Sequence, residues 1–235
     1  MVNAVRLYAL VPCAGTGERA GQTLPKQYAR IAGRSLVAHT LAALAQVPRL
    51  QATLVVLAPG DTWFSSQAGA IDADRVWVAP CGGATRAASV AGGLAELQRR
   101  GAHDDDWVLV HDAARCLLRP AWVDRLIDAC GGDAVGGLLA LPLGDTLKQA
   151  ESGRVRRTLA RADKWLAQTP QMFRLGLLQR ALAQAGSEVT DEASAVEALG
   201  HAPRLVPGEL ENFKITWPQD LALAGRLLRT REAGA

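Results

Sequence analysis

The stretch Val5-Arg-Leu-Tyr-Ala-Leu-Val11 runs directly into Pro12-Cys-Ala-Gly-Thr-Gly-Glu-Arg-Ala-Gly-Gln-Thr-Leu-Pro-Lys-Gln-Tyr28. The first part is a short apolar run, which is typical of a buried strand. The second part places closely spaced glycines directly after that strand, where backbone N–H groups can turn towards a phosphate. The start of the chain therefore predicts a buried strand followed by an anion-binding loop.

The rest of the chain repeats the order of strand and then helix. We expect further strands at 52–57, 75–79, 107–111, 134–141 and near 204–206. We expect helices at 35–46, 61–69, 86–100, 121–130, about 174–184 and 190–199, and a last helix from Pro218. This alternation predicts an α/β fold with a mostly parallel sheet and helices on both faces. In such a sheet, ligands bind at the carboxyl ends of the strands.

Residues 144–170 interrupt the alternation. They have the pattern of two polar strands around the turn Glu151-Ser-Gly153. A hairpin without an apolar face of its own tends to pack on another surface, and we expect a second copy of the chain to supply it. Because the chain has no internal repeat and no linker, we expect one domain of residues 1–235 with this β-arm inserted at about 144–170.

Composition narrows the class of protein. The 235 residues are 49% apolar and 21% charged, which is ordinary for a globular protein and excludes a disordered chain or a coiled coil. The net charge of +3, from 26 Lys and Arg less 23 Asp and Glu, is too small to indicate nucleic acid or a membrane as partner. The four cysteines form no C-x-x-C pair, so we expect reduced thiols and a cytoplasmic protein.

The first glycine-rich loop fits neither of two common nucleotide motifs. Gly15-Thr-Gly-Glu-Arg-Ala20 matches G-x-G-x-x-A, but Pro25 interrupts any following helix. No acidic residue stands between Glu18 and Asp61 to bind a ribose hydroxyl. A P-loop motif is absent as well. The loop therefore predicts phosphate binding without a dinucleotide.

The acid-free segment after Glu18 holds several cations. Arg19 and Lys26 lie in the loop at the strand end, where they could clamp a polyphosphate. We interpret Arg30, Arg34 and Arg49 as a solvated basic face.

Seven motifs appear in order along residues 5–229. After the first loop these are Gly82-Gly-Ala-Thr-Arg-Ala-Ala-Ser-Val90, Val110-His-Asp-Ala-Ala-Arg115, Asp145-Thr-Leu-Lys148, Gln168-Thr-Pro-Gln-Met-Phe173, Thr190-Asp-Glu-Ala-Ser-Ala195 and Asn212-Phe-Lys-Ile-Thr216. Together they resemble the 2-C-methyl-D-erythritol 4-phosphate cytidylyltransferases of the non-mevalonate isoprenoid pathway, within the nucleotidyltransferases that activate sugars and polyols. The resemblance implies transfer of CMP from CTP to the phosphate of methylerythritol phosphate, with release of pyrophosphate and a requirement for Mg²⁺. It also implies a Rossmann-like domain whose β-arm builds a homodimer.

The resemblance assigns the main roles in catalysis. Arg19 and Lys26 would stabilise the five-coordinate transition state, whereas Lys214 and the partner subunit's Arg161 would bind the acceptor phosphate. Thr146 and Thr169 would add hydroxyl donors to that phosphate, although both also fit as plain β-formers. The acceptor phosphate is already anionic at neutral pH, since its second pKa is ~6. No general base is then needed, and His111 is the only histidine inside a motif.

The remaining candidates line the nucleotide and the acceptor. The nucleotide-binding candidates are Cys13, Ala14, Gly15, Thr16, Gly17, Gly82, Gly83, Ala84 and Ser89. Asp112 ends a strand and could hold Mg²⁺ or acceptor hydroxyls, or merely cap the next turn. Arg115 could contact substrate or pair with Asp112, and Arg86 could brace the second glycine loop. We interpret Thr190-Asp-Glu192 first as a helix N-cap with acids in the first turn.

Two alternatives stay open at this point. The acceptor could be another polyol phosphate such as ribitol 5-phosphate, because acceptor choice depends on a few pocket contacts. The chain could instead be a nucleotide-binding regulatory module without turnover, although the joint presence of Arg19, Lys26, Arg161 and Lys214 argues against such a loss.

Overall fold

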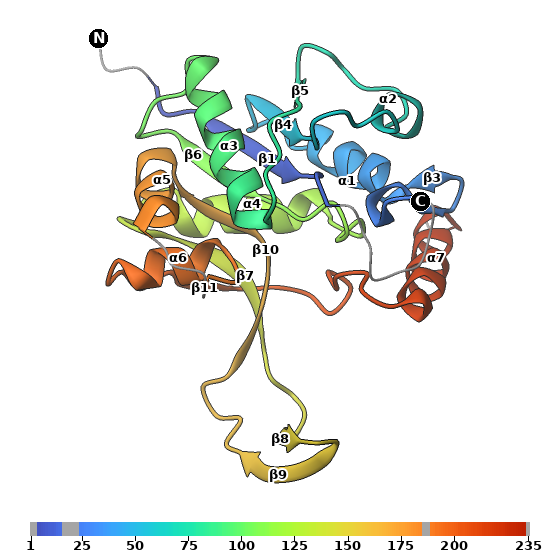
Figure 1. Ribbon diagram of the computed structural model, residues 1–235, viewed down its shortest axis with the longest axis vertical. Helices are drawn as coiled ribbons and strands as arrows, with labels where there is room; N and C mark the ends of the chain where they lie inside the picture. The colour runs from blue at the N-terminus through green and yellow to red at the C-terminus, as the bar shows by residue number, and fades with distance from the viewer. Residues whose placement is uncertain (1–3, 16–23, 185–188, 234–235) are drawn as a thin grey trace.

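A seven-stranded sheet organises the chain (Figure 1). The computed structural model describes residues 4–15, 24–184 and 189–233. The strand order is β11-β7-β10-β6-β1-β4-β5. The bounds are β1 (Leu7–Pro12), β4 (Ala52–Val56), β5 (Val76–Ala79), β6 (Trp107–Val110), β7 (Gly136–Pro142), β10 (Trp165–Arg174) and β11 (Arg204–Pro207). Only β10 runs antiparallel to its neighbours, so the prediction of a mostly parallel sheet is confirmed.

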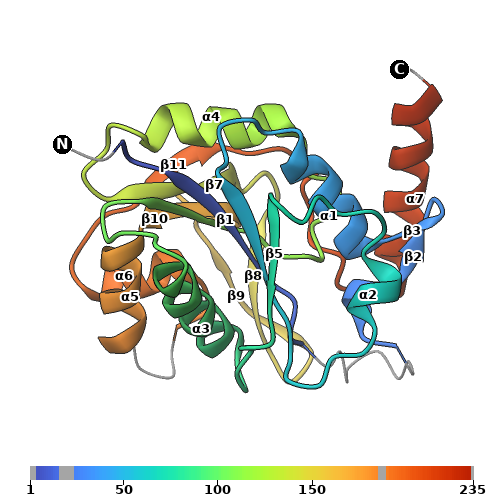
Figure 2. The same ribbon diagram turned by 90° about the horizontal axis from the view of Figure 1, so that it is seen from above.

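Helices cover both faces of the sheet (Figure 2). One face packs against α1 (Leu36–Ala45) and α4 (Pro120–Cys130). The other face packs against α3 (Arg86–Arg99), α5 (Leu175–Gln184) and α6 (Glu192–Ala198). Each of these helices begins within two residues of its expected start. The layered α/β fold is therefore as predicted.

Strand β1 shows why its sequence is a continuous apolar run. Ala9 and Val11 belong to the core on one face of the sheet, whereas Tyr8 and Leu10 belong to the core on the other face. A strand in the middle of a covered parallel sheet has no solvent side, so its residues do not alternate with polar ones.

A third, smaller core lies at the edge of the domain. The short strands β2 (Arg30–Ile31) and β3 (Arg34–Ser35) pair with each other, and α7 (Pro218–Ala233) packs near them. The domain also contains a single turn of 3₁₀ helix, η2 (Lys26–Tyr28), and the short helix α2 (Phe64–Gln67). The sequence did not predict the β2–β3 pair, which is only two residues long on each side.

The β-arm projects away from the sheet (Figure 1). Its tip is an antiparallel pair of β8 (Leu147–Glu151) and β9 (Arg154–Leu159), joined by a turn with positive φ at Ser152 (49°) and Gly153 (75°). Most of its side chains are exposed, so the prediction of a hairpin without an apolar core is confirmed.

The return strand of the arm was only partly predicted. We expected the arm to end near residue 170, but β10 continues from the arm into the middle of the sheet as far as Arg174. Its inner half is buried although Gln168, Thr169 and Gln171 are polar. Polar residues in a buried strand give no apolar run, and their hydrogen-bond partners are distant in sequence. The pattern of the chain therefore concealed this strand.

The described part of the chain contains no helix with both the length and the apolar character needed to cross a bilayer. All four cysteines are unpaired thiols, three of them buried.

Candidate active site

A pocket of about 620 Å³ opens where the parallel strands end. Its lining comes from the loops that follow β1, β4, β5 and β6, together with Lys26, Gln27 and Lys214. The carboxyl edge of such a sheet is where ligands bind in open α/β folds. The structure thus brings together Lys26, Lys214, Asp112 and most of the nucleotide-binding candidates.

One side of the pocket, the glycine wall, is built from Gly82, Gly83 and Ala84. A Cβ at Gly82 would lie 2.2 Å from the Cβ of Ala14 and 2.7 Å from the carbonyl oxygen of Leu57. A Cβ at Gly83 would lie 2.6 Å from that of Ala88. Only glycine fits at either position, so the bare backbone forms the surface of the pocket.

Ser89 supports the glycine wall from the first turns of α3. It is only 3% exposed, and its hydroxyl accepts from the Gly83 N–H at 3.1 Å and donates to the Thr85 carbonyl at 3.0 Å. We expected this hydroxyl to contact the nucleotide. Its hydrogen bonds instead hold the loop that forms the wall, although the residue still borders the pocket.

The first loop lines the pocket with Cys13, Ala14 and Gly15. The amide of Gln27 donates to the carbonyls of Cys13 (3.0 Å) and Gly15 (2.9 Å) and so ties the loop to η2. Burial raises the pKa of the Cys13 thiol to about 12, so this side chain stays neutral. The remaining candidates of this loop, Thr16, Gly17 and Arg19, lie outside the described residues.

A second part of the lining, the charged wall, consists of Arg86, Asp112 and Lys214. Asp112 lies two residues beyond β6, and its two carboxylate oxygens have different partners: Oδ1 contacts Arg86 Nε and Oδ2 contacts Lys214 Nζ, both at 2.8 Å. Burial alone would raise the pKa of the Asp112 carboxyl, but the charges of Arg86 and Lys214 outweigh it and hold the pKa below its ordinary value. Asp112 is therefore an ionised anchor for two cations and caps no turn.

Arg115 does not pair with Asp112, which corrects one of the two roles we expected for it. Its guanidinium donates to the carbonyl oxygens of Asn212 at 2.6 Å and Ala167 at 3.3 Å. Arg115 thus joins the loop after β6 to the segment that carries Lys214, and it does not line the pocket.

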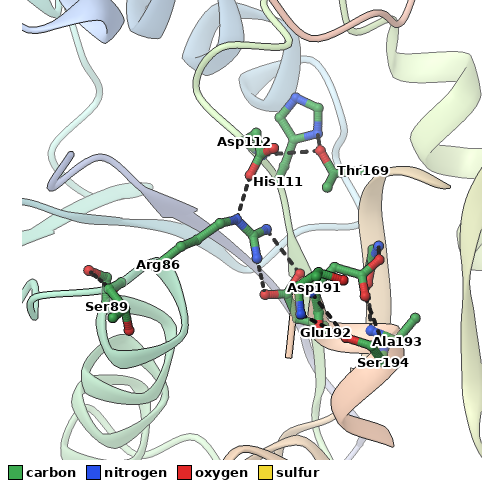
Figure 3. A network of polar contacts seen from close by, with 12 residues as sticks. Arg86, Ser89, His111, Asp112, Thr169, Asp191, Glu192, Ala193 and Ser194 are labelled. Carbon is green, nitrogen blue, oxygen red and sulfur yellow. Dashed lines mark hydrogen bonds and ion pairs between the residues drawn. The ribbon is translucent and has the colours of Figure 1, made fainter. Parts of the chain in front are cut away.

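Glu192 lies behind the charged wall, and sequence reasoning missed its role. Its side chain is fully buried, and its two oxygens accept from Arg86 Nη1 (2.5 Å) and Nη2 (3.0 Å), as Figure 3 shows. The expectation that Thr190–Glu192 forms a helix N-cap is confirmed, with Asp191 as the capping residue: its carboxylate accepts from the Ser194 N–H at 2.9 Å. No sequence pattern links Glu192 to Arg86, since 106 positions separate them.

The buried side chain of His111 supports Asp112 through the hydroxyl of Thr169. The ring of His111 meets the Arg115 carbonyl through Nε2 and the Thr169 hydroxyl through Nδ1, both at 3.1 Å. A carbonyl only accepts, so Nε2 carries the proton and Nδ1 accepts from Thr169. The same hydroxyl oxygen accepts from the Asp112 N–H at 3.1 Å (Figure 3). Burial lowers the pKa of His111 to about 4, so the ring is neutral at pH 7 and orders the loop.

This chain of hydrogen bonds changes the interpretation of Thr169. We expected its hydroxyl to donate to the acceptor phosphate. The residue is 4% exposed, its hydroxyl is occupied by His111 and Asp112, and it does not line the pocket. Thr169 therefore supports Asp112.

The protonation of Lys26 is affected by its surroundings in the pocket. Burial, and then the nearby charge of Lys214, lower the pKa of Lys26. Like charges that share a pocket favour an anionic ligand between them.

The arm residues lie apart from this pocket. Arg161 and Thr146 are exposed, and the Arg161 guanidinium donates to the Gly144 carbonyl within the arm. No described residue of the arm lines the pocket of its own chain. Any contact of Arg161 with this kind of pocket must therefore involve another chain or a moved arm.

The pocket offers little to a metal ion by itself. The described residues contain no group of three His, Cys, Asp or Glu side chains that could hold one. Asp112 is the only carboxylate among the described lining residues, and both of its oxygens are paired with cations. Asp112 therefore does not fit as a metal ligand in this arrangement. A Mg²⁺ ion held mostly by substrate phosphates needs few protein ligands and remains compatible with the pocket.

Comparison with known proteins gives one consistent result. The family described as 2-C-methyl-D-erythritol 4-phosphate cytidylyltransferase matches residues 7–230. The enzyme of that name from Chromobacterium violaceum is 55% identical over 96% of this chain and 99% of its own length. The bifunctional enzyme IspD/IspF of Albidiferax ferrireducens is 63% identical over 97% of this chain, which spans 54% of that longer protein.

A solved structure agrees with these relatives. The crystal structure of a 4-diphosphocytidyl-2C-methyl-D-erythritol synthase superimposes with a TM-score of 0.86 at 42% identity, covering 96% of this chain and 99% of the other. The family match over residues 7–230 includes both walls of the pocket and the arm. The family match and the relatives that align over nearly their whole length agree with the glycine wall and the two lysines of the pocket. The chain therefore belongs to the 2-C-methyl-D-erythritol 4-phosphate cytidylyltransferase family of nucleotidyltransferases.

Proposed function

We propose that the pocket transfers CMP from CTP to 2-C-methyl-D-erythritol 4-phosphate and releases pyrophosphate. The observation that carries this proposal is the meeting of Lys26 and Lys214 in one pocket beside a wall of bare backbone. A pocket with unmatched positive charge and exposed peptide groups suits a nucleotide and a second phosphorylated substrate together.

The glycine wall is our candidate for the cytosine site. The N–H groups of Gly82 and Gly83 already donate to the Leu57 carbonyl and the Ser89 hydroxyl. The Gly82 C=O and the Ala84 N–H are the peptide groups that could read the edge of a base through hydrogen bonds. Ala14 and Gly15 line the pocket next to this wall, where a Cβ at Gly82 would lie 2.2 Å from that of Ala14, and would pass along the phosphates. Thr16, Gly17 and Arg19 complete this loop in the proposal, on the strength of the sequence motif alone.

The chemical step then needs positioning and charge stabilisation. An oxygen of the acceptor phosphate attacks the α-phosphorus of CTP, a new P–O bond forms, and the bond from the α-phosphorus to the bridging oxygen breaks to release pyrophosphate. No proton has to be removed from the nucleophile, because the phosphate is already anionic. Lys26, together with Arg19, would stabilise the charge that develops at the α-phosphorus.

Lys214 is our candidate for binding the acceptor phosphate. Its ammonium already contacts Asp112, and its side chain is 44% exposed, so it can meet an incoming phosphate without leaving the charged wall. Asp112 would in turn meet the acceptor hydroxyls. Thr146 and the partner subunit's Arg161 would approach the same phosphate in a homodimer built through the β-arm. The exposed, polar arm supports this assembly.

Mg²⁺ is the divalent cation that we expect to accompany CTP. When bound, it would neutralise charge on the triphosphate, and the nucleotide's own oxygens would supply most of its ligands. We also propose a cytoplasmic location, where the four unpaired thiols stay reduced.

A direct assay tests the activity. Purified protein with CTP, Mg²⁺ and methylerythritol phosphate should release pyrophosphate, and omission of the acceptor should abolish the release. Ribitol 5-phosphate in place of the acceptor should give a far lower kcat/KM. A higher kcat/KM with ribitol 5-phosphate would reassign the acceptor. Binding of CTP without turnover on any acceptor would instead support a regulatory module.

A further inference from the structure

Glu192 connects to the reaction through Arg86. Arg86 begins α3 and reaches towards both the loop after β6 and the start of α6 (Figure 3). Its Nε donates to Asp112 Oδ1, whereas Nη1 and Nη2 both donate to Glu192. The guanidinium of Arg86 therefore binds two carboxylates, and it donates one hydrogen bond to Asp112 and two to Glu192.

Arg86 binds Glu192 more strongly than it binds Asp112. A carboxylate that takes two parallel N–H donors of a guanidinium forms the stronger, more directional pair. Glu192 is fully buried and has no other cation among its described contacts, so it holds the two Nη atoms. Asp112 receives only the Nε–H, on one of its two oxygens. The other oxygen of Asp112 stays available, and Lys214 occupies it at 2.8 Å.

Glu192 is itself held rigidly. It follows the capping residue Asp191, and β10 pins this turn through Gln171. The Gln171 side chain donates to Asp191 Oδ2 and accepts from the Ala193 N–H, both at 2.8 Å. The carboxylate of Glu192 therefore has a fixed position relative to the sheet.

We propose that Glu192 is a positioning residue: it occupies both Nη atoms of Arg86, and thereby keeps one oxygen of Asp112 free to hold Lys214 at the acceptor end of the pocket. This inference rests on the proposed role of Lys214 in acceptor binding. If Glu192 lost its charge, Arg86 would turn its two-donor edge to Asp112, because that carboxylate would then be its only anionic partner among the residues that the structure describes. Lys214 would lose its anchor and spend less time at the pocket.

The test substitutes Glu192→Gln, which keeps the shape and removes the charge. The KM for methylerythritol phosphate should rise about 10- to 100-fold, as expected for loss of a hydrogen bond to a charged group. The KM for CTP should change less than about twofold, since the glycine wall does not depend on this contact. Glu197→Gln, an exposed position on the same helix, is the matched control and should behave as wild type.

A second readout does not depend on turnover. An amine-selective acylating reagent, followed by mass spectrometry, should label Lys214 faster in Glu192→Gln than in wild type. Labelling of Lys148 on the arm should stay the same in both proteins. If wild-type protein does not turn over, the proposed function fails, yet the labelling still decides whether Glu192 holds Lys214 in place.

Further variants separate positioning from general destabilisation. In a Lys214→Ala background, Glu192→Gln should no longer alter the acceptor KM, because its effect passes through Lys214. Glu192→Asp keeps the charge and should lie between wild type and Glu192→Gln, and it serves as the test protein if the glutamine variant does not fold. Unchanged labelling of Lys214, or equal increases in both KM values, would overturn the proposal.

Discussion

The charged wall of the pocket and the β-arm hold their charges in opposite ways. In the wall, Asp112 is buried and divided between Arg86 and Lys214, and Glu192 fixes Arg86 from behind. On the arm, the charged side chains are exposed and contact mostly neutral neighbours. Lys148 contacts Thr158, Arg157 contacts Gln149, and Arg161 contacts the Gly144 carbonyl. One exposed ion pair joins Arg156 to Glu151 at 3.7 Å.

The difference shows which charges the chain itself positions. A buried ion must be paired, since an unpaired one costs several kcal/mol, so the wall has one arrangement. Exposed ion pairs contribute only about 0–1 kcal/mol, so the arm can exchange its contacts for those of another surface at little cost. We therefore expect substitutions in the wall to act within one chain and substitutions on the arm to act between chains.

The largest effect is expected at Lys26. Lys26→Ala should lower kcat roughly 100- to 1,000-fold, the usual loss when a transition-state donor is removed. The KM for CTP should change less, because the charge acts mainly in the transition state. Steady-state kinetics with varied CTP measures both values, and Arg34→Ala, an exposed arginine outside the pocket, is the control. A change in KM alone would remove Lys26 from the chemical step.

Mixed dimers test the arm. Lys26→Ala and Arg161→Ala proteins should each be nearly inactive, and a one-to-one mixture should recover about a quarter of wild-type activity after subunit exchange. Random pairing makes half of the dimers mixed, and each mixed dimer has one complete site in a two-fold assembly. Pyrophosphate release over time measures the recovery. No recovery, with exchange demonstrated, would place Arg161 in its own subunit's site or in none.

His111, which supports the charged wall, should make the free energy of unfolding depend on pH. The pKa of His111 is about 4 in the folded protein, against about 6.5 in an unfolded chain. Between these values the unfolded state binds more protons, so the free energy of unfolding should fall as pH decreases from 6.5 towards 4. The contribution is about 3 kcal/mol at most.

Chemical denaturation at several pH values measures that slope. His111→Gln should lose this part of the slope, whereas His103→Gln, at an exposed position, should keep it. Equal slopes in wild type and His111→Gln would mean that the buried ring does not titrate as its surroundings indicate.

The smallest effect is expected on the glycine wall. Gly82→Ala puts a methyl group within 2.2 Å of the Ala14 Cβ, so the loop must move and the protein should lose about 1–3 kcal/mol of stability. The KM for CTP should rise, while that for the acceptor changes little. Gly132→Ala, where a Cβ would meet nothing within 4 Å, is the matched control. Wild-type binding of CTP by Gly82→Ala would show that the wall is not the nucleotide site.

Much of the fold could be predicted from local pattern. The apolar run at Leu7–Pro12 and the strand–helix alternation indicated the parallel sheet and both helical layers, because burial on two faces leaves a continuous apolar signature. The polar hairpin of the arm was equally visible. β10 was not, since its buried polar residues find partners only after folding.

The same distinction between local pattern and distant contacts applies to the residues of the site. Sequence motifs indicated the glycine wall, Lys26, Asp112 and Lys214, because loops after parallel strands converge at one edge of the sheet. They did not indicate the hydrogen bonds that Arg115 and Thr169 make behind the pocket, and they missed Glu192. Apart from the local contact of the Arg115 carbonyl with His111, these three residues act through hydrogen bonds to residues between 43 and 106 positions away.

The sequence by itself determined the order of the elements, the backbone that faces the pocket, and the supply of cations, since these follow from residue type and spacing. Tertiary structure alone decided which carboxylate holds which cation. That choice depends on the burial and direction of side chains from α3, α6, β6 and β10, and no local pattern records how four separate segments meet.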